Sequence, residues 1–132
     1  MKIVFTNGCF DILHSGHVQY LNEAKALGDK LIVGLNSDSS VKRLKGNERP
    51  INNENDRKYI LENLKAVDEV IIFDADTPIE LIEKVKPSVL VKGGDWPAEK
   101  IVGYEFVRNN GGTVTSLSFK DGYSTTSVLE KI

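Results

Sequence analysis

Cysteine is nearly absent from this chain of 132 residues, which contains only Cys9. A single cysteine excludes an intramolecular disulfide and a cysteine-based zinc site. This fits a reducing compartment, and we expect a cytoplasmic protein. Long apolar runs are missing as well, and the N-terminal run at residues 3–5 is too short for a signal peptide or a membrane span. We therefore expect no membrane partner.

Neither sign of charge dominates, because 17 basic residues face 19 acidic ones and the net charge is −2. Such a balance gives no overall basic field, so we expect no nucleic-acid partner. An anionic ligand would need local positive charge, and the one dense basic cluster is Lys42-Arg43-Leu44-Lys45. Internal repeats, low-complexity tracts and Pro/Ser-rich linkers are also missing. We predict one domain over residues 1–132, which is long enough for its own core.

Apolar runs rich in β-branched residues alternate with amphipathic stretches. The pattern predicts strands at 3–5, 31–35, 70–73, 89–91 and 113–117, with helices near 18–27, 54–64, 100–108, after Thr77 and after Ser124. Gly28 is a natural stop for the first helix, and Thr77-Pro78-Ile79-Glu80 is typical of a capped helix start. The predicted fold is a Rossmann-like, doubly wound α/β sheet of five parallel strands with helices on both faces. Ligands of such sheets bind beyond the carboxyl ends of the strands.

The segment after the first strand holds both histidines of the chain. Gly8 allows a tight turn whose amides can face a ligand. His14 and His17 flank Gly16, and Ser15 can cap the following helix. Both imidazoles would then lie at a helix N-terminus, which attracts anions. We interpret the pair as donors to a phosphoryl oxygen on which charge builds.

Other interpretations of this segment are weaker. A lone histidine usually satisfies a polar group near a loop, but these two lie together around a glycine. A metal site would have only Asp11 beside the histidines and lacks a third strong ligand. Cys9 is better explained as a small residue in a tight loop than as a nucleophile.

Two later segments could also meet a nucleotide. Lys42 and Lys45 could neutralise a triphosphate, although a solvated surface run has the same composition. In the segment 92–96, two glycines permit close approach of a flat ligand, Trp96 offers an aromatic face, and Asp95 could accept from a base or a ribose. Equally, Trp96 could fill the edge of the core.

The last two candidates lie on helices. Ser124 and Thr125 open the final helix and could hold phosphates, and Ser124 would serve as an N-cap in any case. Arg57 could point back into the crevice, or it could form a surface salt bridge.

Taken together, these segments resemble the cytidylyltransferase-like nucleotidylyltransferase superfamily. Its hallmarks are a G-x-F-D turn, an H-x-G-H motif and a late S-T-T segment, here residues 8–11, 14–17 and 124–126. Along its whole length the chain resembles the adenylyltransferase domain of bifunctional heptose synthesis proteins. The segments that carry this likeness are Thr6-Asn7-Gly8, Asn36-Ser37-Asp38, Lys42-Arg43-Leu44-Lys45-Gly46, Arg49-Pro50, Asp76-Thr77-Pro78, Val91-Lys92-Gly93-Gly94-Asp95 and Phe119-Lys120-Asp121-Gly122-Tyr123-Ser124-Thr125-Thr126.

The resemblance implies transfer of AMP from ATP to D-glycero-β-D-manno-heptose 1-phosphate, a step toward lipopolysaccharide. His14, His17 and Lys45 would be catalytic, and Mg²⁺ would bind mainly through the triphosphate rather than through protein ligands. The relatives are commonly homodimers. The other residues expected to contact the nucleotide are Asn7, Gly8, Cys9, Phe10, Asp11, Lys42, Arg57, Gly93, Asp95, Trp96, Ser124 and Thr125.

Two departures from the relatives matter. The bifunctional proteins carry a sugar kinase domain that is not in this sequence, and the start at Met1 favours a stand-alone form served by a separate heptose kinase. Glycerol-3-phosphate cytidylyltransferases usually have Arg-Thr where this chain has Phe119-Lys120, which weakens that alternative. A non-catalytic nucleotide sensor and an adapter that shares only the fold are the remaining alternatives.

Overall fold

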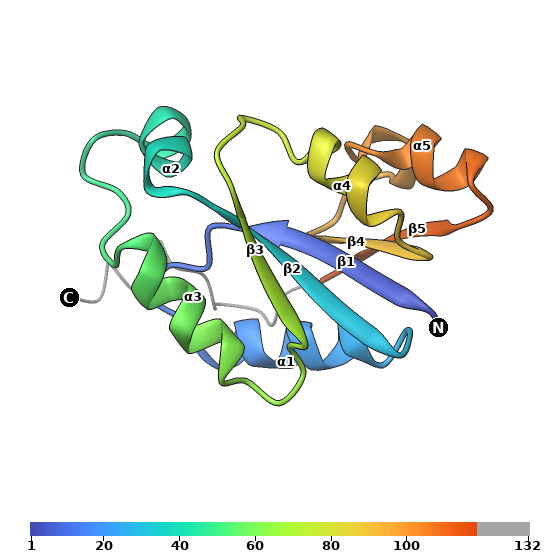
Figure 1. Ribbon diagram of the computed structural model, residues 1–132, viewed down its shortest axis with the longest axis horizontal. Helices are drawn as coiled ribbons and strands as arrows, with labels where there is room; N and C mark the ends of the chain where they lie inside the picture. Colours follow the sequence, from blue (N-terminus) through green and yellow to red (C-terminus); the bar gives the residue numbers. More distant parts are fainter. Residues whose placement is uncertain (119–132) are drawn as a thin grey trace.

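Five parallel strands form a sheet in the computed structural model, which describes residues 1–118. They are β1 (Ile3–Gly8), β2 (Lys30–Asn36), β3 (Glu69–Phe73), β4 (Val89–Gly93) and β5 (Thr113–Leu117). Their order is β3-β2-β1-β4-β5, so the chain moves outward from β1 to β3 and then crosses back to β4 (Figure 1). The predicted Rossmann-like parallel sheet is confirmed, whereas the helix predicted after Ser124 lies outside the described residues.

Helices cover both faces of the sheet. On one face lie α1 (Ser15–Lys25) and α3 (Glu54–Glu62), and on the other lie α4 (Ile79–Val85) and α5 (Tyr104–Asn109) (Figure 1). Successive strand residues enter opposite cores, because side chains alternate along a strand. Val4 packs in the core that includes Leu21 of α1, while Phe5 packs with Ile82 of α4. Each such buried side chain contributes about 1.5–3 kcal/mol, so sheet and helices are held from both sides.

The basic cluster after β2 is a helix that the sequence pattern did not predict, α2 (Asp38–Lys45). Ser37 caps its N-terminus, because the Ser37 hydroxyl accepts from the backbone N–H of Ser40 at 3.1 Å. Gly46 ends it with a φ of 104°. The helix presents mainly polar residues, so apolar periodicity gave no signal for it.

Three predicted boundaries are wrong. His14, not Ser15, caps α1. Thr77 is not the cap of α4, which follows Pro78 without a side-chain capping bond. The helix expected at 100–108 is a short 3-10 turn, η1 (Ala98–Lys100), followed by α5. Gly103 separates the two, with a φ of 95° and room for no side chain, since a Cβ there would lie 2.9 Å from Ile82.

Candidate active site

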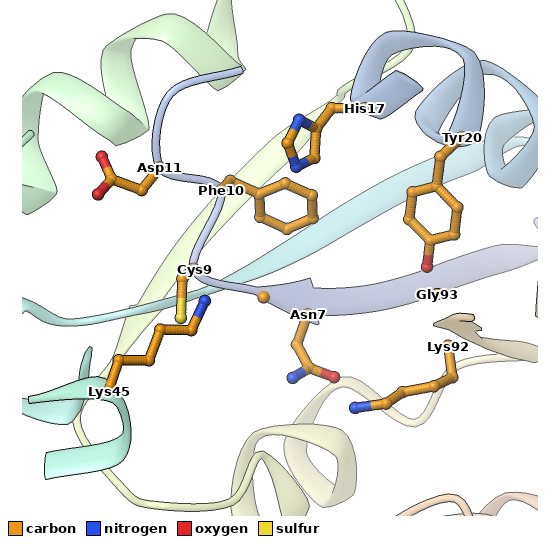
Figure 2. A pocket seen from close by; sticks show the side chains of 10 residues that line it. Asn7, Cys9, Phe10, Asp11, His17, Tyr20, Lys45, Lys92 and Gly93 are labelled. Carbon is orange, nitrogen blue, oxygen red and sulfur yellow. The ribbon is translucent and has the colours of Figure 1, made fainter. Parts of the chain in front are cut away.

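A hollow of about 210 Å³ opens at the carboxyl ends of β1 and β4, where the strand order reverses. Ligands of doubly wound sheets bind at this point. Figure 2 shows side chains from the β1–α1 segment, from α1, from α2 and from β4 converging there. The lining residues are Asn7, Gly8, Cys9, Phe10, Asp11, His17, Tyr20, Lys45, Lys92 and Gly93.

A buried carboxylate fixes the loop that follows β1. Asp11 is 1% exposed and accepts backbone N–H groups from Ile51 at 2.6 Å and Asn52 at 3.0 Å. The residues on either side of Asp11, Phe10 and Ile12, have positive φ values of 45° and 53°. Such conformations cost about 1–3 kcal/mol each and persist only where the surroundings impose them. Asp11 lines the hollow, and these bonds show that it also braces the loop.

The two histidines form a reciprocal cap at the start of α1. Nδ1 of His14 accepts the backbone N–H of Gly16 at 3.1 Å, and Nδ1 of His17 accepts the backbone N–H of His14 at 3.2 Å. The rings lie with centroids 4.0 Å apart. Because each Nδ1 is an acceptor, the proton of each neutral imidazole belongs on Nε2. Each ring is thereby oriented as an Nε2–H donor.

Both histidines are held in the neutral form. Burial, together with the adjacent His14 and the positive charge of Lys45, lowers the pKa of His17 to about 4. Burial also lowers the pKa of His14. Protonation would put a hydrogen on Nδ1, where a backbone N–H already points. At neutral pH the site therefore offers uncharged donors, and its positive charge comes from lysine.

Two lysines approach the hollow from opposite sides. Lys45 ends α2 and Lys92 lies in β4, and in Figure 2 the Lys45 ammonium lies beside Cys9 while the Lys92 ammonium points toward Asn7. Lys92 was not among the predicted contact residues, although the segment that contains it was. Tyr20 was missed too. It is 2% exposed and its hydroxyl lies 2.6 Å from that of Thr6.

A second hollow of about 340 Å³ shares a rim with the first. The shared residues are Asn7, Gly8, Cys9, Lys45 and Lys92. From this rim the second hollow extends over α2 and the loop before α4. Its other lining residues are Asn36, Leu44, Asp76, Thr77, Pro78 and Val102.

Arg57 lies in neither hollow and is not on the surface. It is 1% exposed, so the surface salt bridge weighed from the sequence is wrong. Its guanidinium donates to the carbonyl oxygens of Asn52, Cys9 and Asn36 at 2.8–2.9 Å and to the Asp38 carboxylate at 2.8 Å. Arg57 therefore ties together the segments that follow β1, β2 and α2.

Several predicted contact residues lie away from the two hollows. Lys42 is exposed on α2, and Asp95 is exposed with its carboxylate accepting the Ser118 hydroxyl at 2.8 Å. Trp96 is 51% exposed, so it does not fill the core edge, and the Lys92 ammonium lies 5.6 Å from its ring. His14 contacts the lining through His17.

Other predicted features are tested only in part. Ser124 and Thr125 fall outside the described residues. Within residues 1–118, no three His, Cys, Asp or Glu side chains gather as metal ligands, and no helix has the length and apolar character to cross a membrane.

Comparison with known proteins identifies relatives over nearly the whole chain. Residues 5–131 match the family model described as cytidylyltransferase-like. A protein of Marinomonas sp. (strain MWYL1), named bifunctional protein HldE, is 61% identical over 98% of this chain, and one of the same name from Geotalea uraniireducens is 58% identical over 99%. The chain spans 27% of the length of each.

Solved structures also resemble this chain in fold. The lipopolysaccharide core biosynthesis protein of Thermoplasma volcanium is 35% identical with a TM-score of 0.72, and the match covers 94% of this chain and 99% of that one. A pantothenate synthetase of Thermus thermophilus is 16% identical with a TM-score of 0.61, over 100% of this chain and 62% of that one, and shares the fold.

Proposed function

The chain belongs to the cytidylyltransferase-like family and is a nucleotidyltransferase, and on that premise we propose that it is an adenylyltransferase. The proposed reaction transfers AMP from ATP to D-glycero-β-D-manno-heptose 1-phosphate and yields ADP-heptose and pyrophosphate. The resemblance of the motifs quoted above to heptose synthesis proteins supports heptose as the sugar, and the relative from Thermoplasma volcanium is named a lipopolysaccharide core biosynthesis protein. We further propose a cytoplasmic homodimer that receives its sugar phosphate from a sugar kinase.

One observation carries the proposal: the neutral donor His17, which packs against His14, and two lysines line a hollow at the N-terminus of an 11-residue helix. Charge on a phosphoryl group grows as a transfer reaction proceeds. Preorganised donors stabilise such charge because they need no reorientation during the reaction. A helix N-terminus adds its own positive potential for phosphate.

The reaction follows from this arrangement. A phosphate oxygen of the sugar phosphate attacks the α-phosphorus of ATP, and the bond from that phosphorus to the pyrophosphate oxygen breaks in line. The attacking phosphate is already ionised, so a strong general base is not required. Alignment of the two phosphates and stabilisation of charge are then the main contributions of the protein.

Individual residues have distinct parts in this proposal. The Nε2–H of His17, next to His14, donates to the α-phosphate oxygens as charge builds there. Lys45 and Lys92 offset the charge of the phosphates from opposite sides. Removing one such donor costs roughly 3–4 kcal/mol of barrier, a factor of 10² to 10³ in rate.

The residues around the first hollow fit a magnesium ion that is bound mainly through the triphosphate rather than by protein side chains. Among residues 1–118, Asp11 is the one carboxylate that lines the first hollow, and it accepts from two backbone N–H groups. When bound through the triphosphate, Mg²⁺ would supply positive charge that offsets the charge of the phosphates.

The test measures pyrophosphate release with heptose 1-phosphate and Mg²⁺ against ATP, CTP, GTP and UTP in turn. We expect turnover with ATP alone, and a loss of at least about 100-fold in His17→Ala. Gln19→Ala is the matched control, because Gln19 is exposed on the same helix, does not line the first hollow and donates to the Glu23 carboxylate at 3.3 Å. Turnover with CTP would overturn the adenylyl assignment, while absence of turnover with every nucleotide would favour a sensor or an adapter.

A further inference from the structure

The two hollows share the loop that follows β1 and extend from it in two different directions. The first extends toward α1 and contains His17 and Tyr20. The second extends over the other side of the loop, toward α2 and the β3–α4 connection. Lys45 and Lys92 belong to both. A transfer between two phosphorylated substrates requires two binding regions that meet at the reacting phosphate, and a shared rim provides that meeting point.

The second hollow changes character along its length. Its shared rim includes Lys45 and Lys92, whereas Asp76 and Thr77 line the part that it does not share with the first hollow, here called its far end. A phosphate is attracted to the ammonium groups and repelled by the carboxylate. Neutral hydroxyl groups have the opposite preference, since they donate well to a carboxylate. A ligand that fills this hollow therefore carries its phosphate at the rim and its hydroxyl groups at the far end.

Asp76 is held in place for such a contact. The Nε of Arg43 donates to the Asp76 carboxylate at 2.8 Å, and another nitrogen of the Arg43 guanidinium donates to the backbone oxygen of Asp74. Arg43 lies on α2, the same helix that ends in Lys45. The group at the far end and the ammonium group at the rim are thus positioned by one helix. A carboxylate oriented in this way loses little side-chain entropy when it binds a ligand.

We propose that the second hollow is the sugar subsite, in which the Asp76 carboxylate and the Thr77 hydroxyl bind the hydroxyl groups of the sugar phosphate. The inference rests on the proposed function for the identity of the sugar. The hollow then sets acceptor specificity, while the first hollow receives the nucleotide.

The experiment separates the two substrates. Steady-state rates are measured for Asp76→Asn and Thr77→Val while heptose 1-phosphate and ATP are varied separately. Loss of a hydrogen bond to a charged group lowers affinity by about tenfold or more. We expect a rise of about tenfold in KM for the sugar phosphate in Asp76→Asn, a smaller rise in Thr77→Val, and a KM for ATP within about twofold of wild type.

Asp74→Asn is the matched control, because Asp74 is an exposed carboxylate near the same arginine but does not line the second hollow. This variant should leave both KM values unchanged. Equal changes in the two KM values, or no change in Asp76→Asn, would overturn the subsite.

A binding measurement tests the subsite independently of the catalytic reaction. Saturation-transfer NMR of heptose 1-phosphate is recorded on the whole protein with a non-hydrolysable ATP analogue. Signal in wild type that weakens in Asp76→Asn but not in Asp74→Asn supports the subsite even if turnover is absent, in which case the proposed function alone fails. Equal signal in all three proteins, or none in wild type, refutes the subsite.

Discussion

The two ends of the parallel strands, here called the carboxyl edge and the amino edge, are held together in different ways. At the carboxyl edge, buried side chains join the loops, with Arg57 and Asp11 each 1% exposed and each bonded to backbone groups of other segments. At the amino edge the ion pairs are solvated, as between Lys25 and Asp68 at 2.5 Å. Buried polar groups are costly to leave unpaired, whereas exposed pairs contribute little. The contrast indicates that the edge with the hollows is built for fixed geometry.

Removing the Arg57 guanidinium is expected to have the largest effect. Arg57→Met would leave three carbonyl oxygens and the Asp38 carboxylate without their donor. Breaking a buried pair of this kind costs about 3–5 kcal/mol of unfolding free energy. Urea denaturation measures it. Arg43→Met, which removes an arginine that is about half exposed, should lower the free energy of unfolding far less than Arg57→Met does. Equal losses of unfolding free energy in the two variants would mean that buried and solvent-exposed side chains stabilise the protein to the same extent.

Acid should weaken the carboxyl edge through His17. The folded-state pKa is about 4, below the usual 6.5, so the unfolded chain binds more protons between these values. The stability that His17 contributes is therefore complete above pH 6.5 and is lost as the pH falls toward 4. NMR titration of the ring protons tests this directly. Lys45→Met should raise the pKa of His17, because it removes a neighbouring positive charge. A His17 pKa near 6.5 in the wild type would contradict the proposed neutral donor.

Substitutions at the amino edge should have the smallest effect on stability. Lys25→Met removes the ion pair with Asp68, whose side chain still accepts the backbone N–H of Leu31 at 2.7 Å. We expect a loss of about 1 kcal/mol or less, which shrinks further in high salt because exposed charges are screened. Thermal unfolding at low and high salt checks this. A loss comparable to that of Arg57→Met would mean that the two edges are braced alike.

The sequence predicted the sheet well and the side-chain partnerships poorly. Runs such as Leu31 to Leu35 are apolar and β-branched enough to predict buried strands without any tertiary information. The helix α2 was missed because its signals were the cap at Ser37 and the end at Gly46, not an apolar stripe. Propensity and caps can therefore determine a helix that hydrophobic periodicity does not reveal.

Within the site, residues in motifs were easier to find than residues that meet only in three dimensions. Gly8, His17 and Lys45, which the motifs singled out, all line the first hollow. The contacts of Arg57 reach residues up to 48 positions away, so no local pattern could give them. Tyr20 lies one helical turn beyond His17 and has the spacing of a core residue, which concealed its place in the lining.

The reciprocal cap of His14 and His17 has a dynamic consequence. The same two ring nitrogens that orient the donors also terminate the first turn of α1. Fraying of that turn would release both rings together, and a ligand that fixes the rings would protect the turn from opening. The amide protons of His14 and Gly16 should therefore exchange with solvent more slowly once a triphosphate is bound, and their exchange rates would report site occupancy from the backbone itself.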